Sequence, residues 1–161
     1  MNSEIEQLGN LTFLQASATI GLAMALVALV RIDLRDLRLP DRITLPLIGV
    51  GLILAVVEGR GWPVEAAIGA AVGYGTFWLI GTVYFRLRRR DGLGLGDAKL
   101  LAAAGAWLGP SALPWVVLIA ATLALGFAVA TAKGRQVPLA FGPWLALGFW
   151  AMWIIGLTAG R

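Results

Sequence analysis

Long uninterrupted runs of apolar residues limit what this chain can fold into more than any other feature. The four longest runs contain about 20 residues each, which is the length an α-helix needs to cross the hydrocarbon core of a bilayer. Apolar residues make up 59% of the 161 residues and charged residues only 14%, whereas soluble domains are near half apolar and a quarter charged. A chain of this size cannot bury so much apolar surface away from water. We therefore expect the solvent around it to be membrane lipid.

Six apolar segments are candidate helices. They are residues 11–30, 43–57, 64–85, 98–108, 113–132 and 139–157. Backbone amides must be hydrogen-bonded within hydrocarbon, and the sequence lacks the alternating pattern of a membrane β-barrel. These features predict an all-α polytopic membrane protein, a bundle of about six transmembrane helices. The segments 43–57 and 98–108 are short, so we expect these two helices to begin or end inside the membrane, near a functional site.

The distribution of positive charge predicts the orientation in the membrane. Eleven of the 13 lysines and arginines lie in the segments 31–42, 86–99 and 133–135. Because basic loops stay in the cytoplasm, we expect both termini to lie outside. The net charge of +4 is explained by these loops, and no nucleic-acid partner is expected.

Tryptophans and glycines add two further expectations. Trp62, Trp107 and Trp115 would lie at the outer membrane boundary, where tryptophan is enriched. The spacings Gly69-x-x-x-Gly73 and Gly105-x-x-x-Gly109 would allow the third and fourth helices to approach their neighbours closely.

The chain contains no cysteine and no histidine. Disulfides, thiol catalysis and cysteine-ligated zinc are thereby excluded, and the commonest general base and metal ligand is missing. Any chemistry must use carboxylates, hydroxyls or basic groups. We expect no metal and no cofactor.

Two aspartates are candidates for this chemistry because they lie at the ends of apolar runs. Asp33 directly follows the first run and Asp97 directly precedes the fourth, and ionisable groups at a membrane boundary are often functional. Simpler roles remain open at this point: Asp33 as a solvated charge in an Arg/Asp loop, and Asp97 as a helix N-cap. We expect Asp41 to be an N-cap, and Asp36 and Asp91 to be solvated loop charges.

Three alternating glycines, Gly92, Gly94 and Gly96, precede Asp97. The pattern is neither a phosphate-binding loop nor a dinucleotide fingerprint, because the required residues and spacing are missing. Glycines can adopt positive φ and leave a bare backbone against which an extended peptide can lie. Next to an aspartate at a membrane face, they suggest peptide-bond chemistry.

Four sequence blocks resemble the type IV prepilin peptidases, which are membrane-embedded aspartic proteases. The blocks are the Gly-x-Gly-Asp signature at 94–97, Asp-Leu-Arg with Leu-Pro-Asp and Leu-Pro at 33–46, the segment 98–109, and Ala-Phe-Gly-Pro-Trp-Leu-Ala at 140–146. The resemblance covers about residues 15 to 155. It implies that Asp33 and Asp97 are the catalytic pair. The implied substrate-binding residues are Gly94, Gly96, Gly142 and Pro143.

The resemblance also implies a substrate and a location. The substrate would be a type IV prepilin or pseudopilin with a short basic leader, cleaved at the cytoplasmic face of the bacterial inner membrane. Larger family members carry a segment with paired Cys-x-x-Cys motifs and a methyltransferase activity, which this sequence does not match. We therefore expect residues 1–161 to form a single peptidase domain, similar to the peptidases of tight-adherence pili.

Two alternatives to a peptidase stay open from the sequence. A small helical membrane protein with boundary aspartates could be a proton-coupled transporter or channel, although such proteins carry carboxylates near the bilayer midplane. The chain could also be an inactive pilus-assembly relative that has kept both aspartates.

Overall fold

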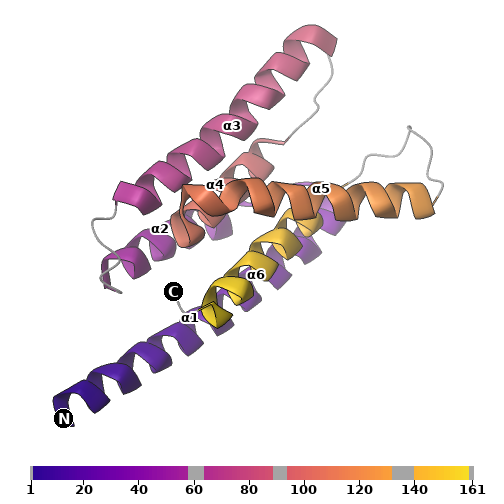
Figure 1. Ribbon diagram of the computed structural model, residues 1–161. Coiled ribbons are helices and arrows are strands. Elements are labelled where there is room, and N and C mark those ends of the chain that lie inside the picture. Colours follow the sequence, from indigo (N-terminus) through magenta and orange to yellow (C-terminus); the bar gives the residue numbers. More distant parts are fainter. Residues whose placement is uncertain (1, 58–63, 89–93, 132–139, 160–161) are drawn as a thin grey trace.

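The computed structural model describes residues 2–57, 64–88, 94–131 and 140–159. Within these ranges the chain forms six α-helices and one short 3-10 helix, with no strand, which confirms the all-α class. The elements are α1 (Asn2–Asp36), α2 (Asp41–Val57), α3 (Val64–Arg88), α4 (Leu95–Leu108), η1 (Pro110–Ala112), α5 (Leu113–Ala130) and α6 (Gly142–Thr158). Figure 1 shows how the helices are arranged.

Three helical stretches are long and apolar enough to cross a membrane, Phe13–Asp36, Val64–Leu87 and Pro110–Ala130, and α6 is a shorter apolar helix. Large apolar side chains such as Ile20, Met24 and Leu125 are exposed on these helices. Lipid is the solvent in which such an apolar exterior is stable. The protein is therefore an all-α polytopic membrane protein, as predicted.

The short helix α4 lies inside the bundle. It contacts α2, α3, α5 and α6, and its residues from Leu100 to Trp107 are all buried. At 1.5 Å per residue, its 14 residues extend only about 21 Å, which is less than the thickness of the hydrocarbon core. As expected for a short apolar helix, α4 is surrounded by protein.

Glycines allow the backbones of α3 and α4 to touch. A Cβ added to Gly69 would lie 2.2 Å from the carbonyl oxygen of Gly105, and one added to Gly73 would lie 2.5 Å from that of Leu101. The predicted close approach is thus confirmed, and the backbone of Gly109 also takes part, because its carbonyl carbon would lie 3.1 Å from a Cβ added to Gly69. Gly109 itself has nothing within 4 Å of an added Cβ and has a positive φ of 79° at the end of α4.

Helices α1 and α6 run antiparallel. The end of α1 contacts the start of α6, where Gly142 lies against Asp33, and further along Trp153 donates a hydrogen bond to Oγ1 of Thr19 at 3.0 Å. Figure 1 accordingly shows the last turns of α6 beside the middle of α1, with the first turns of α1 extending beyond them. An ion pair between Lys99 and Asp41 joins the starts of α4 and α2. The end of α1 and the starts of α2, α4 and α6 therefore lie together.

Trp107 is a core residue, so its predicted position at the outer membrane boundary is wrong. Its side chain is buried, its Nε1 donates to the carbonyl oxygen of Leu47 at 2.8 Å, and its ring packs edge-on against Trp153. The reason is that α4 ends within the bundle. Trp115 is exposed, and Trp62 lies outside the described residues.

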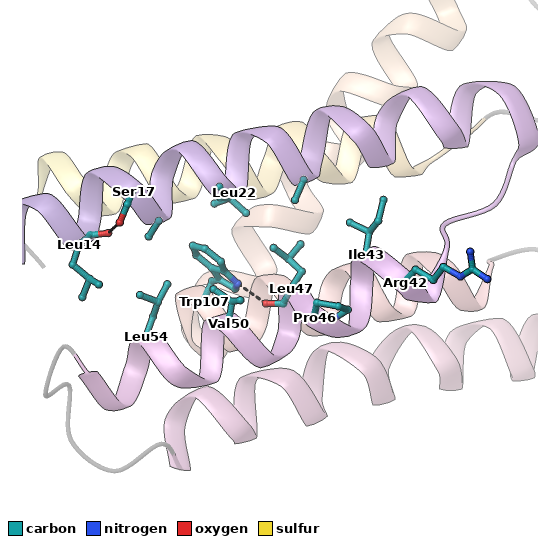
Figure 2. Close-up of a pocket in the computed structure, with 13 residues that line it drawn as sticks. Leu14, Ser17, Leu22, Arg42, Ile43, Pro46, Leu47, Val50, Leu54 and Trp107 are labelled. Carbon is teal, nitrogen blue, oxygen red and sulfur yellow. Dashed lines mark hydrogen bonds between the residues drawn. The ribbon is translucent and has the colours of Figure 1, made fainter.

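An apolar cavity of about 450 Å³ lies between α1 and α2. Figure 2 shows Trp107 between the two helices, with Arg42 near one end of the cavity and Leu14 and Leu54 near the other. None of the predicted site residues lines this cavity.

Candidate active site

Asp33 lies in the last turns of α1 and is buried, with 5% of its surface exposed. The helix ends at Asp36, and Leu37 then adopts a left-handed conformation with φ of 51°. Its backbone N–H donates to the carbonyl oxygen of Asp33 at 2.9 Å. A left-handed conformation costs a non-glycine residue roughly 1 kcal/mol. This turn ends α1 just beyond Asp33 and directs the chain into α2.

Asp97 lies in the first turn of α4, where its backbone N–H donates to the carbonyl oxygen of Gly94 at 3.1 Å. The expectation that Gly94 and Gly96 adopt positive φ is wrong. Gly94 is extended with φ of −71°, and Gly96 is the second residue of the helix. Among the described residues, only Leu37 and Gly109 have positive φ. Gly92 lies outside the described residues.

One cavity of about 300 Å³ brings the two aspartates together. Asp33 reaches it from α1 and Asp97 from α4. Gly94 and Gly96 also line it. The remaining lining residues are Leu37, Arg38, Leu39, Leu95 and Lys99.

The environment of Asp97 favours its protonated form. The pKa of Asp97 is raised to about 6. Burial is the largest cause, the charge of nearby Asp33 adds to the shift, and the backbone hydrogen bond from Gly94 opposes it. Asp97 is outside the three stretches that can cross a membrane. Asp97 is not the N-cap considered from the sequence, because the N-cap of α4 is Gly94 and no side chain caps it by a hydrogen bond. Asp97 lies in the first turn, where a carboxylate complements the helix dipole.

Gly142 lies directly against Asp33. A Cβ added to Gly142 would lie 2.5 Å from Oδ2 of Asp33, so a larger residue would displace the carboxylate. Oδ2 of Asp33 is buried, and it has no hydrogen-bond partner among the described residues. Pro143 does not reach the aspartates' cavity. It lines a separate apolar cavity between α1 and α6.

The other aspartates have different surroundings. Asp41, expected as an N-cap, is the first residue of α2 and forms the ion pair with Lys99. Asp36 is exposed, as expected, and Asp91 lies outside the described residues. Within the described part of the chain, no three His, Cys, Asp or Glu side chains gather as metal ligands would. The donors that this site offers are two carboxylates.

Sequence reasoning missed Leu39 and Lys99 as residues of the site. Leu39 is 8% exposed and contacts the positions of both Gly96 and Gly142. A leucine before a proline carries no signal of such a contact. Lys99 could have been considered, because it follows Asp97 by two residues.

Comparison with known proteins assigns the chain to a family. The model of the type IV leader peptidase family matches residues 20–129, a range that includes Asp33 and Asp97. The chain belongs to this family. No solved structure matches the chain significantly.

Several relatives are named prepilin leader peptidase/N-methyltransferase. The one from Burkholderia pseudomallei (strain 1026b) is 48% identical over 138 residues, which are 83% of this chain and 44% of that protein. The one from Escherichia coli (strain K12) is 42% identical over 120 residues, 73% of this chain and 53% of that protein. The one from Aeromonas hydrophila is 39% identical over 148 residues, 89% of this chain and 51% of that protein. The chain thus spans about half the length of these relatives.

Proposed function

We propose that this protein is a membrane-embedded aspartic endopeptidase that removes the short basic leader from type IV prepilins or pseudopilins. The observation that carries the proposal is the shared cavity of Asp33 and Asp97, which come from different helices. Membership of the type IV leader peptidase family supports it.

Two carboxylates are sufficient for peptide hydrolysis when they share one proton. The ionised carboxylate takes a proton from a water molecule, whose oxygen attacks the scissile carbonyl carbon. The protonated carboxyl donates its proton to the carbonyl oxygen, which gives a tetrahedral intermediate. The C–N bond then breaks as the carboxyl that took the water proton passes it to the departing amine, and the other carboxylate takes back a proton from a hydroxyl group as the carbonyl re-forms. Because the pKa of Asp97 is raised to about 6, the pair can retain a proton near neutral pH, and it titrates as a unit.

The site would act at the cytoplasmic face of the bacterial inner membrane, with both termini outside. Arg31, Arg35 and Arg38 lie at the same end of α1 as Asp33, and basic residues favour the cytoplasmic side. Within a membrane helix the carbonyl groups are hydrogen-bonded, so cleavage requires an unwound segment. The end of the substrate helix at the membrane surface is where such a segment is available.

The glycines contribute to substrate binding in different ways. Gly94 is exposed and lines the cavity, so its bare backbone can contact an extended leader. Gly96 and Gly142 act through the packing around Asp97 and Asp33. Pro143, one of the first two residues of α6, helps to start that helix at Gly142.

A proton-coupled transporter is the second class considered. It would carry carboxylates along a path through the bundle. Here Asp33 lies three residues before the end of α1 and Asp97 in the first turn of α4. Carboxylates at helix ends favour chemistry at the membrane surface.

The test is co-expression with candidate prepilins, reading leader removal by mass spectrometry. Asp33→Asn and Asp97→Asn should each abolish processing while the protein stays in the membrane, because an amide cannot share the proton. Asp36→Asn, a matched change at an exposed aspartate of the same helix, should retain most activity. Near wild-type processing by either of the first two variants contradicts the proposal, and an inactive wild type would favour the non-catalytic relative.

A further inference from the structure

Leu39 packs between the start of α4, which carries Asp97, and the start of α6, which lies against Asp33. It belongs to the segment between α1 and α2 and is buried. A Cβ added to Gly96 would lie 2.8 Å from the Cβ of Leu39. A Cβ added to Gly142 would lie 3.4 Å from its Cδ1. One side chain therefore contacts both α4 and α6.

Each of these glycines lies beside one aspartate. Gly96 directly precedes Asp97 in the chain, and Gly142 contacts the carboxylate of Asp33. Leu39 therefore packs against the two backbone positions that adjoin the aspartates. The glycines permit the contact because they have no side chain.

The backbone that carries Leu39 is held in an unfavourable conformation. Leu37, two residues earlier, has a φ of 51°. Backbone strain of this kind persists only where the surrounding packing outweighs it. The Leu39 side chain, which follows this turn by two residues, is buried.

We propose that Leu39 is a positioning residue that sets the separation of the Asp33 and Asp97 carboxylates. The effect of Leu39 on cleavage rests on the proposed function, whereas its effect on the separation of the two carboxylates does not. Leu39 also lines the cavity of the two aspartates, but the role proposed here is exerted through its packing. It acts through Gly96 on α4 and Gly142 on α6.

Compensating changes in size test this role. Gly96→Ala should reduce processing roughly tenfold or more, because displacements of about 1 Å in an active site have large effects on rate. Leu39→Gly, which removes the contacting Cβ, should also reduce it. The double variant should process prepilin at least as fast as the less active of the two single variants, because the new methyl group occupies space that the Leu39 side chain has vacated.

Two further variants serve as controls. Gly142→Ala should not be rescued by Leu39→Gly, because its closest clash is with Asp33 itself at 2.5 Å. Gly75→Ala should resemble the wild type, since an added Cβ there has nothing within 4 Å.

A second measurement is independent of activity. The chain has no cysteine, so Asp33→Cys with Asp97→Cys gives a clean pair for a short thiol-specific crosslinker in membranes. Gly96→Ala should lower the crosslinking yield, and Leu39→Gly should restore it. If this pattern appears while the native protein cleaves no prepilin, the proposed function fails and the positioning role stands. Independent, multiplicative effects of the two substitutions, or a crosslinking yield that neither changes, would overturn the role of Leu39.

Discussion

The raised pKa of Asp97 predicts where activity stops responding to pH. An ordinary aspartate has a pKa of 3.8, and burial together with Asp33 raises that of Asp97 to about 6. A carboxyl with this pKa is about half protonated at pH 6 and about 90% protonated at pH 5. If cleavage needs its proton, the rate should therefore increase less than about twofold between these pH values. An unshifted carboxyl would still give an increase of about tenfold over the same interval.

The assay is initial processing of a purified prepilin by the protein in lipid vesicles at pH 8 to 5. The rate should increase as the pH falls from 8 and should level off between pH 6 and pH 5, because the protonated fraction approaches its limit in that interval. Infrared absorption of the protonated carboxyl measures the same titration without substrate. In Asp33→Asn the pKa of Asp97 should fall but stay above 3.8, because burial is the larger cause of the shift.

Asp36→Asn is the matched control, since Asp36 is exposed and does not line the cavity. It should leave both titrations unchanged. A rate that keeps increasing about tenfold per pH unit from pH 6 to 5, as for an unshifted aspartate, would refute the argument from burial.

Two further predictions concern the scaffold. Gly105→Ala should destabilise the protein by about 1–3 kcal/mol, because the new Cβ would lie 2.1 Å from the carbonyl oxygen of Gly69. Thermal unfolding in detergent measures this loss. Gly126→Ala should show no comparable loss, because an added Cβ there has nothing within 4 Å. A reporter fused at the C-terminus should be external and one inserted near Arg89, which is outside the described residues, cytoplasmic; a cytoplasmic C-terminus would contradict the charge-based orientation.

Hydrophobic runs predicted the helices but not all of their ends. The first run was placed at residues 11–30, whereas α1 extends from Asn2 to Asp36. The additional turns contain polar and charged residues, which a search for apolar runs does not detect. Similarly, α4 begins at Leu95 and includes the last three residues of the signature, Leu95, Gly96 and Asp97. Helix ends depend on local hydrogen bonds as well as on transfer to lipid.

The sequence singled out Asp33, Asp97, Gly94 and Gly96, and these residues line one cavity. Their catalytic and binding roles remain predictions. The conformations of the glycines could not be predicted in the same way. Positive φ is one reason for a glycine, and close contact with another segment is a second. Only the fold shows that Gly96 has the second reason, because Leu39 is distant in sequence.

Contacts at both ends of α4 explain how a buried helix can present an aspartate accurately. Near its start Gly96 faces Leu39, and the next residue, Asp97, carries one of the two carboxylates. Towards its other end Gly105 touches the backbone of α3 at Gly69. At both places the contact involves a glycine that has no rotamers to change. Because main-chain atoms cannot yield as a flexible side chain can, α4 has little freedom to slide, and the position of Asp97 relative to Asp33 follows from the packing of the whole bundle.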